Sequence, residues 1–153
     1  MALFEIVEAH KETLTGRIAT SQEIKLLESK FSDYPMLTEL LSLVNGYKLI
    51  GQVFEIPDSE NPSGIQVDME WMAPQKQIDE AFHYYPGIIA SKQQYIPVGN
   101  CLSGSGDPYF IKYEGGEWIL YRVILDVATD DVFTDEMLEY IMPLEKAFSY
   151  VVK

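Results

Sequence analysis

The residues best suited to chemistry lie in one short stretch, CLSGSGD, residues 101–107, which joins two strand-like runs. It holds the only cysteine of the chain, two serines, two glycines and an aspartate. A dinucleotide-binding loop leads from a strand into a helix that faces the pyrophosphate, whereas this stretch leads into a strand. A Walker phosphate loop would need Gly-Lys where this chain has Ser105-Gly106. We therefore interpret the segment as a connection between strands, in which Asp107 supports a local turn.

The remaining candidate residues do not form a catalytic set. Nucleophilic catalysis needs a base beside the nucleophile, but His10 and His83 are far from the loop in sequence. We interpret His10 as a packed histidine and Cys101 as a small buried hydrophobe. A hydrolase built on paired carboxylates would need a deep pocket and a carboxylate of raised pKa. In a chain this acidic we interpret the pairs as solvated faces; they are Asp68 with Glu70, Asp130 with Asp131, and Asp135 with Glu136. We expect no enzymatic activity, no metal and no cofactor.

Net charge is the strongest compositional signal. The 153 residues include 24 Asp and Glu against 11 Lys and Arg, which gives −13 and a pI near 4.4. Such a surface repels nucleic acid and anionic membranes and suits a basic protein partner, although solubility alone could also explain it. The single cysteine excludes an internal disulfide and favours a reducing compartment. The first residues lack the features of a secretory signal, so we expect a cytoplasmic protein.

The order of predicted elements indicates an α+β domain with a mostly antiparallel sheet flanked by helices. Apolar periodicity and capping signals predict helices over residues 3–14, 20–34, 35–46, 74–85 and 134–152, the last of them kinked or split at Pro143. β-branched and aromatic runs predict strands over 47–56, 65–71, 93–100, 108–113 and 118–125. The pair Gly115-Gly116 predicts a tight hairpin between the last two strands. One domain over residues 1–153 accounts for this length.

Several of these stretches together resemble the SUKH superfamily, named in part for a fungal cell-wall synthesis regulator. The first block is a helix with Glu23-Ile24 and Leu27-Glu28, a break at Pro35, and an L-x-x-L-L helix that closes at Asn45-Gly46. The second block is Ile96-Pro97-Val98-Gly99 followed by Gly106-Asp107, the hairpin and a closing helix. The resemblance covers residues 20–152, with residues 1–16 as an additional N-terminal helix.

The resemblance implies an α+β fold and, for bacterial members, an immunity protein that binds and neutralises a cognate toxin, often a nuclease. No catalytic residue is implied. We expect the partner to have a basic surface, because complementary charge accelerates association. The alternative is a regulatory or scaffold module of the cell-wall synthesis regulator type. The residues that we predict to bind the partner, on the hypothesis that they share one concave face of the sheet, are Asp68, Glu70, Trp71, Ser103, Asp107 and Tyr109.

Overall fold

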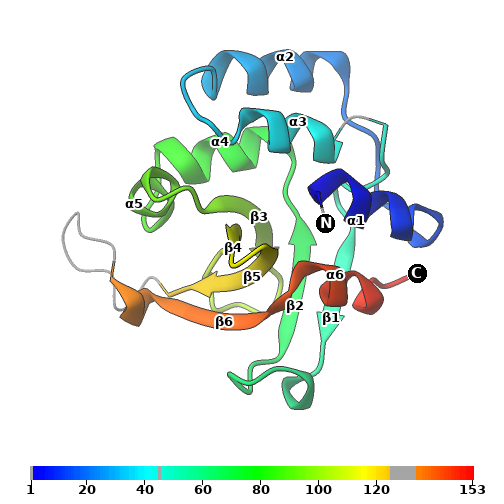
Figure 1. Cartoon of the computed structure of the whole chain (residues 1–153), viewed down its shortest axis with the longest axis vertical. Helices are drawn as coiled ribbons and strands as arrows, with labels where there is room; N and C mark the ends of the chain where they lie inside the picture. The colour runs from blue at the N-terminus through cyan, green and yellow to red at the C-terminus, as the bar shows by residue number, and fades with distance from the viewer. Residues whose placement is uncertain (1, 45, 125–133) are drawn as a thin grey trace.

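The computed structural model describes residues 2–44, 46–124 and 134–153, and these form an α+β fold (Figure 1). The helices are α1 (Leu3–His10), α2 (Ser21–Lys30), α3 (Leu37–Val44), α4 (Pro74–Phe82), α5 (Gly87–Lys92) and α6 (Leu144–Ala147). The strands are β1 (Val53–Ile56), β2 (Val67–Trp71), β3 (Ile96–Cys101), β4 (Tyr109–Glu114), β5 (Glu117–Val123) and β6 (Leu138–Pro143). They form one sheet in the order β1 to β6 with every neighbouring pair antiparallel. The prediction of an α+β domain with a mostly antiparallel sheet is confirmed.

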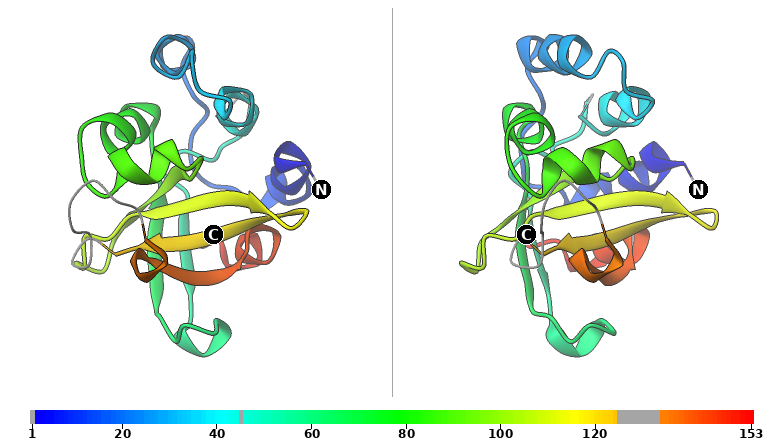
Figure 2. Two further views of the ribbon diagram at one scale, coloured as in Figure 1. Left: turned by 60° about the vertical axis from the view of Figure 1, so that its left-hand side comes forward. Right: turned by 90° about the vertical axis from the view of Figure 1, so that its left-hand side faces the viewer.

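The sheet curls, and the helices cover it from several sides (Figure 2). The β1–β2 hairpin stands steeply across the β4–β5 hairpin, while α4 and α5 lie along β3 and α6 lies against β5 and β6. The side-chain hydroxyl of Ser63, in the β1–β2 connection, donates to the carbonyl of Tyr140 in β6. Val151 pairs with Phe54 of β1. These two contacts link the two edges of the sheet, the β1–β2 hairpin and the chain at and after β6. The main hydrophobic core fills the space between the sheet and the helices.

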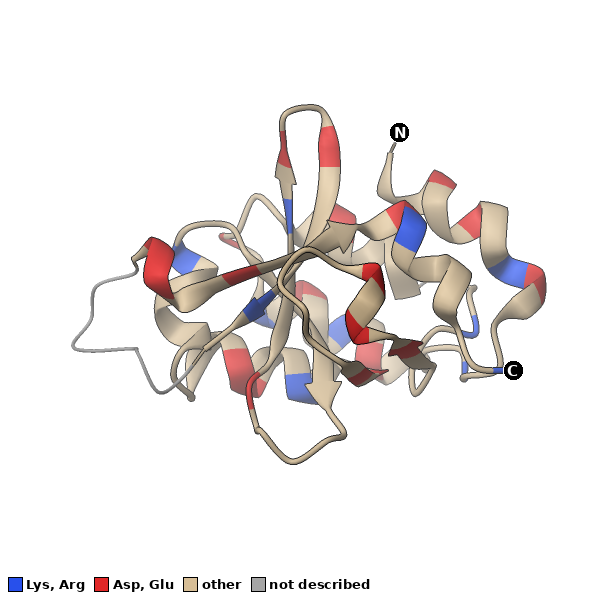
Figure 3. Cartoon of the chain, turned by 90° about the horizontal axis from the view of Figure 1, so that it is seen from below, with Lys and Arg blue, Asp and Glu red and all other residues tan. Residues whose placement is uncertain are grey.

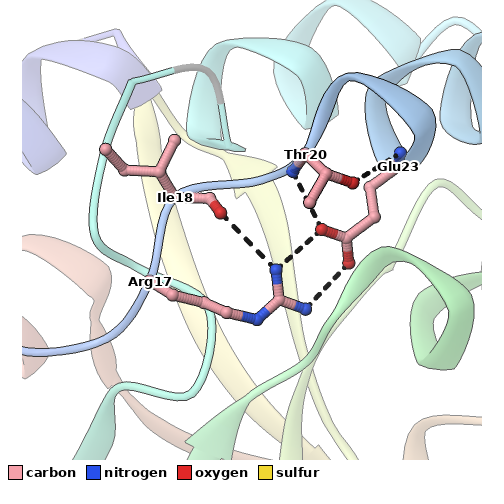
Figure 4. A network of polar contacts seen from close by, with 4 residues as sticks. All are labelled: Arg17, Ile18, Thr20 and Glu23. Atoms are coloured by element: carbon pink, nitrogen blue, oxygen red, sulfur yellow. Dashed lines mark hydrogen bonds and ion pairs between the residues drawn. The ribbon is translucent and has the colours of Figure 1, made fainter.

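The start of α2 follows directly from its sequence (Figure 4). The Thr20 hydroxyl accepts a hydrogen bond from the Glu23 amide at 3.2 Å, and the Glu23 carboxylate accepts one from the Thr20 amide at 3.0 Å. This is the predicted capping box, which satisfies two amides that have no partner inside the helix. Arg17 donates two further hydrogen bonds to Glu23 at 2.7 and 2.9 Å. Mainly through Arg17, the pKa of Glu23 falls to about 2.

The β4–β5 hairpin also agrees with the prediction. Gly115 and Gly116 have φ angles of +56° and +84°, the left-handed conformation that a primed hairpin turn requires at both central positions. Glu114 pairs with Glu117 across the turn, and the register continues to Tyr109 opposite Arg122. β5 is an interior strand between β4 and β6. Ile119 and Leu120, which point to opposite faces of the sheet, are both buried, so both faces of β5 are covered, which explains why apolar residues occur on both of them.

The prediction of a closing helix from residue 134 is wrong over most of its length. Residues 138–143 form β6, and only Leu144–Ala147 are α-helical before a 3-10 turn at Phe148–Tyr150. The apolar positions fit a helical period, but pairing with β5, from Val123 opposite Leu138 to Ile119 opposite Pro143, makes them a strand. Pro143 does not kink a helix; it stands just before the first residue of α6, where a missing N–H costs little.

Two smaller predictions are also corrected. The strand expected over 47–56 is confined to Val53–Ile56, because Gly51 adopts φ +81° and turns the chain. The helix expected over 74–85 ends at Phe82, and a separate helix, α5, follows it at Gly87–Lys92. Three predicted features lie outside the described residues: Asn45 as a helix end, the pair Asp130 with Asp131, and the strand end at residue 125.

Candidate partner-binding surface

The six residues predicted to bind a partner do not share one face of the sheet. In β2, Val67, Met69 and Trp71 are buried in the core, while Asp68 and Glu70 between them are half-buried. Because successive side chains of a strand point to opposite faces, the two carboxylates point away from Trp71. Trp71 is fully buried, in contact with the rings of Phe54 and Phe148. It is a core residue, and the hypothesis of a single shared face is wrong.

The outer face of the β1–β2 hairpin carries closely spaced negative charge. The register sets Glu55 directly opposite Asp68, with Glu70 two residues along the same strand. Directly opposite side chains in an antiparallel pair are about 5 Å apart at Cβ, and like charges there are destabilising. Glu55 is exposed. We call Glu55, Asp68 and Glu70 the acidic face.

The glycine loop borders this acidic face. The amide of Leu102 donates to the carbonyl of Asp68 at 2.8 Å, so the loop starts beside β2. Leu102 is 50% exposed, and Ser103 is exposed beside it. Asn100, opposite Glu70 in the register, extends the same outer face onto β3. An exposed leucine beside carboxylates is a combination that a protein partner with both basic and apolar groups can use.

The same loop surrounds the thiol of Cys101. Its sulfur lies 3.2 Å from the Ser103 hydroxyl and 3.1 Å from the Ser105 hydroxyl. Burial alone would raise the pKa of Cys101, but hydrogen bonds from the hydroxyls and backbone amides of these serines lower it to about 7. The thiol is half-buried, so the sequence-based interpretation of a simple buried hydrophobe is incomplete.

Asp107 and Tyr109 lie at the base of the loop, inside the fold. Tyr109 is 1% exposed and Asp107 is 8% exposed. Tyr109 is opposite Arg122 in the register, and Arg122 forms an ion pair with Glu139 at 2.5 Å. Asp107 contributes to the raised pKa of Arg122, so it lies within electrostatic range of this pair. Of the six predicted residues, only Asp68, Glu70 and Ser103 reach the surface.

Negative charge is distributed widely over the molecule. Acidic segments occur on most elements in Figure 3, and basic segments are fewer. In the described part of the chain three ion pairs are present, Glu8 with Lys11, Glu23 with Arg17 and Glu139 with Arg122. Most of the described carboxylates take part in none of these three pairs.

One carboxylate has the raised pKa that a catalytic acid would need. Burial raises the pKa of Glu80 to about 7, while a hydrogen bond from the Gly87 amide at 3.0 Å opposes the rise. Glu80 lines neither the hollow between α1, α3 and the β4–β5 hairpin nor the hollow between α1 and Tyr47. Its oxygen instead accepts from the first amide of α5. Over residues 2–44, 46–124 and 134–153, no group of three His, Cys, Asp or Glu side chains is placed to hold a metal ion.

Sequence reasoning missed Glu55, Asn100 and Leu102 at this surface. A usable signal was present for Glu55, because aligning the apolar residues Phe54 and Met69 across the hairpin places Glu55 opposite Asp68. Asn100 and Leu102 depend on the β2–β3 pairing, which joins segments 30 residues apart and leaves no local signal.

Comparison of the chain with protein-family models, with curated proteins and with solved structures finds no match. None of the described helices has the length and apolar character needed to cross a membrane.

Proposed function

We propose that this chain is a non-enzymatic, cytoplasmic immunity protein that binds and neutralises a cognate bacterial toxin, a nuclease with a basic surface. The supporting observation is the acidic face, on which Glu55 and Asp68 stand directly opposite each other on neighbouring strands. Such a pair lowers the stability of the free protein. A basic partner would relieve the repulsion and gain from the same charges during association.

The resemblance to SUKH domains supplies the class of partner, and the surface supplies the mode of binding. A nuclease must present cations to hold phosphates, so a carboxylate-rich protein that covers those cations blocks substrate without doing chemistry. Leu102 and Ser103 at the edge of the acidic face offer apolar and hydrogen-bonding contacts beside the charges.

The test is calorimetric titration with the toxin domain encoded beside this protein, at about 50 and about 300 mM salt, where the Debye length shortens from about 14 to about 6 Å. We expect tight one-to-one binding that weakens with salt, together with loss of the nuclease activity. In the double variant Asp68→Asn/Glu70→Gln, we expect binding at low salt to weaken about tenfold, mainly through slower association.

The matched control is Glu28→Gln/Asp33→Asn, which removes the same number and kind of charges from the exposed end of α2 and the turn after it. If both variants weaken binding equally, only net charge matters and the acidic face is not the binding surface. If no toxin domain binds, and the chain instead binds several cellular proteins weakly, the alternative of a regulatory scaffold module replaces the proposal.

A further inference from the structure

A second surface, separate from the acidic face, has the form of a binding groove. A hollow of about 700 Å³ lies between the start of α1, the start of α3 and the β4–β5 hairpin. This volume is in the range of sites that hold a small molecule or a few side chains. Figure 2 shows the N-terminus beside the tip of the β4–β5 hairpin in both views.

The groove has an apolar floor and aromatic walls. Leu3, Met36 and Ile96 line it and are buried, so the floor is continuous with the core. Phe4 is 51% exposed and Tyr113 is 55% exposed, and Trp118 stands beside Tyr113 with ring centroids 5.4 Å apart. Half-exposed aromatic rings next to one another are the residue types that anchor protein interfaces.

The charge of the groove selects the occupant. Two charged side chains are among the described residues that line it, Glu39 and Lys112. The Lys112 ammonium is already engaged, because it donates to the carbonyl of Gln93 at 3.0 Å and lies 4.4 Å from the centre of the Tyr95 ring. The Glu39 carboxylate, half-buried in the first turn of α3, makes no hydrogen bond or ion pair with the described residues.

We infer that the groove binds an arginine-bearing segment of a protein partner, with the guanidinium on Glu39 and against the Tyr113 and Trp118 rings. A guanidinium suits this site because it bonds a carboxylate in a bidentate manner and stacks on aromatic faces. An apolar residue beside the arginine fills the floor. A carboxylate in the first turn of a helix also stabilises the helix dipole, so the test must separate binding by Glu39 from its effect on α3.

This inference rests on the proposed function only for the class of partner, a basic protein. The probes are the peptide acetyl-Phe-Arg-Leu-amide and its citrulline analogue, which has nearly the same shape without the charge. Amide and indole NMR shifts of the full chain are followed up to about 5 mM peptide, which is enough to detect a dissociation constant of about 1 mM. We expect shifts at Phe4, Glu39, Tyr113 and Trp118, and at least fivefold weaker binding of the citrulline peptide.

The variant Glu39→Gln should bind the two peptides with equal affinity, and that affinity should equal the affinity of the wild type for the citrulline peptide. The four affinities form a double-mutant cycle that measures the coupling between Glu39 and the guanidinium. A merely structural role of Glu39 would weaken both peptides together. Asp68→Asn/Glu70→Gln should leave both affinities unchanged, so the groove and the acidic face can fail separately. Equal affinity of the wild type for the two peptides, shifts outside the groove, no shifts at all, or a dimer of this chain that covers the groove would overturn the inference.

Discussion

Replacement of Glu80 by glutamine tests whether burial of this carboxyl group destabilises its charged form in the folded protein. Glu80 is half-buried on α4, and burial raises its pKa from an ordinary 4.5 to about 7. Glutamine keeps an oxygen that can accept the hydrogen bond from the Gly87 amide and removes only the charge. The two pKa values differ by about 2.5, which corresponds to about 3 kcal/mol of unfolding free energy at 1.36 kcal/mol for each pKa unit.

The sign follows from where the proton binds. Below pH 4.5 the carboxyl is protonated in both the folded and the unfolded chain. Between 4.5 and 7 the unfolded chain releases the proton first, so the stability that this group contributes falls as pH rises and is fully lost above pH 7. About 2 kcal/mol of the total loss of about 3 kcal/mol occurs between pH 5.5 and pH 8.5. Glu80→Gln lacks the titration and should not share the loss.

The assay is urea unfolding at pH 5.5 and pH 8.5, both above the pI near 4.4. We expect the stability advantage of Glu80→Gln over the wild type to widen by about 2 kcal/mol between the two pH values. Glu28→Gln, at an exposed position of α2, is the control and should show no widening. An advantage that stays constant with pH would refute the reasoning that burial of Glu80 destabilises its charged form.

Three further predictions concern local structure. Gly87→Ala should lower the unfolding free energy by about 3 kcal/mol, because the alanine Cβ would lie 1.9 Å from the carbonyl oxygen of Glu80. A loss of less than about 1 kcal/mol in urea unfolding would contradict that contact. Thr20→Ala should cost about 1 kcal/mol by removing the cap of α2, and an unchanged urea midpoint would argue against it. The rate at which iodoacetamide alkylates Cys101 should rise with pH around a midpoint near pH 7, and Ser105→Ala should move that midpoint to higher pH. A wild-type midpoint near the ordinary thiol pKa of 9 would contradict the proposed hydrogen bonding.

The parts of the fold that were predicted correctly are those decided within a few residues. The capping box of Thr20 and Glu23 involves neighbours three residues apart, and the Gly115-Gly116 turn needs two adjacent residues that tolerate positive φ. The alternation of buried and half-buried residues along β2 was also predicted correctly, because in a strand with one buried face every second residue is buried. The α+β class followed from the order of such elements.

The candidate site was predicted in part. Asp68, Glu70 and Ser103 do reach the surface near one another, since the Leu102 amide binds the Asp68 carbonyl. Trp71 and Tyr109 were misplaced because a large aromatic residue suits a core and an interface equally well, and only burial distinguishes the two. The groove at Glu39 was not predicted, because α1, α3 and the β4–β5 hairpin that form it are separated by dozens of residues.

The sequence by itself determined the local turns, the caps, the strongly acidic character and the two-residue alternation that separates Asp68 and Glu70 from the core. Only the tertiary structure decided that residues 138–143 are a strand and that Glu55 stands against Asp68. The physical reason is the same in both cases. Hydrogen bonding between strands depends on which backbone segment lies beside the edge of the sheet. Pairing with β5 overrides the helical period of residues 138–143, and pairing of β1 with β2 sets the like charges of Glu55 and Asp68 opposite each other.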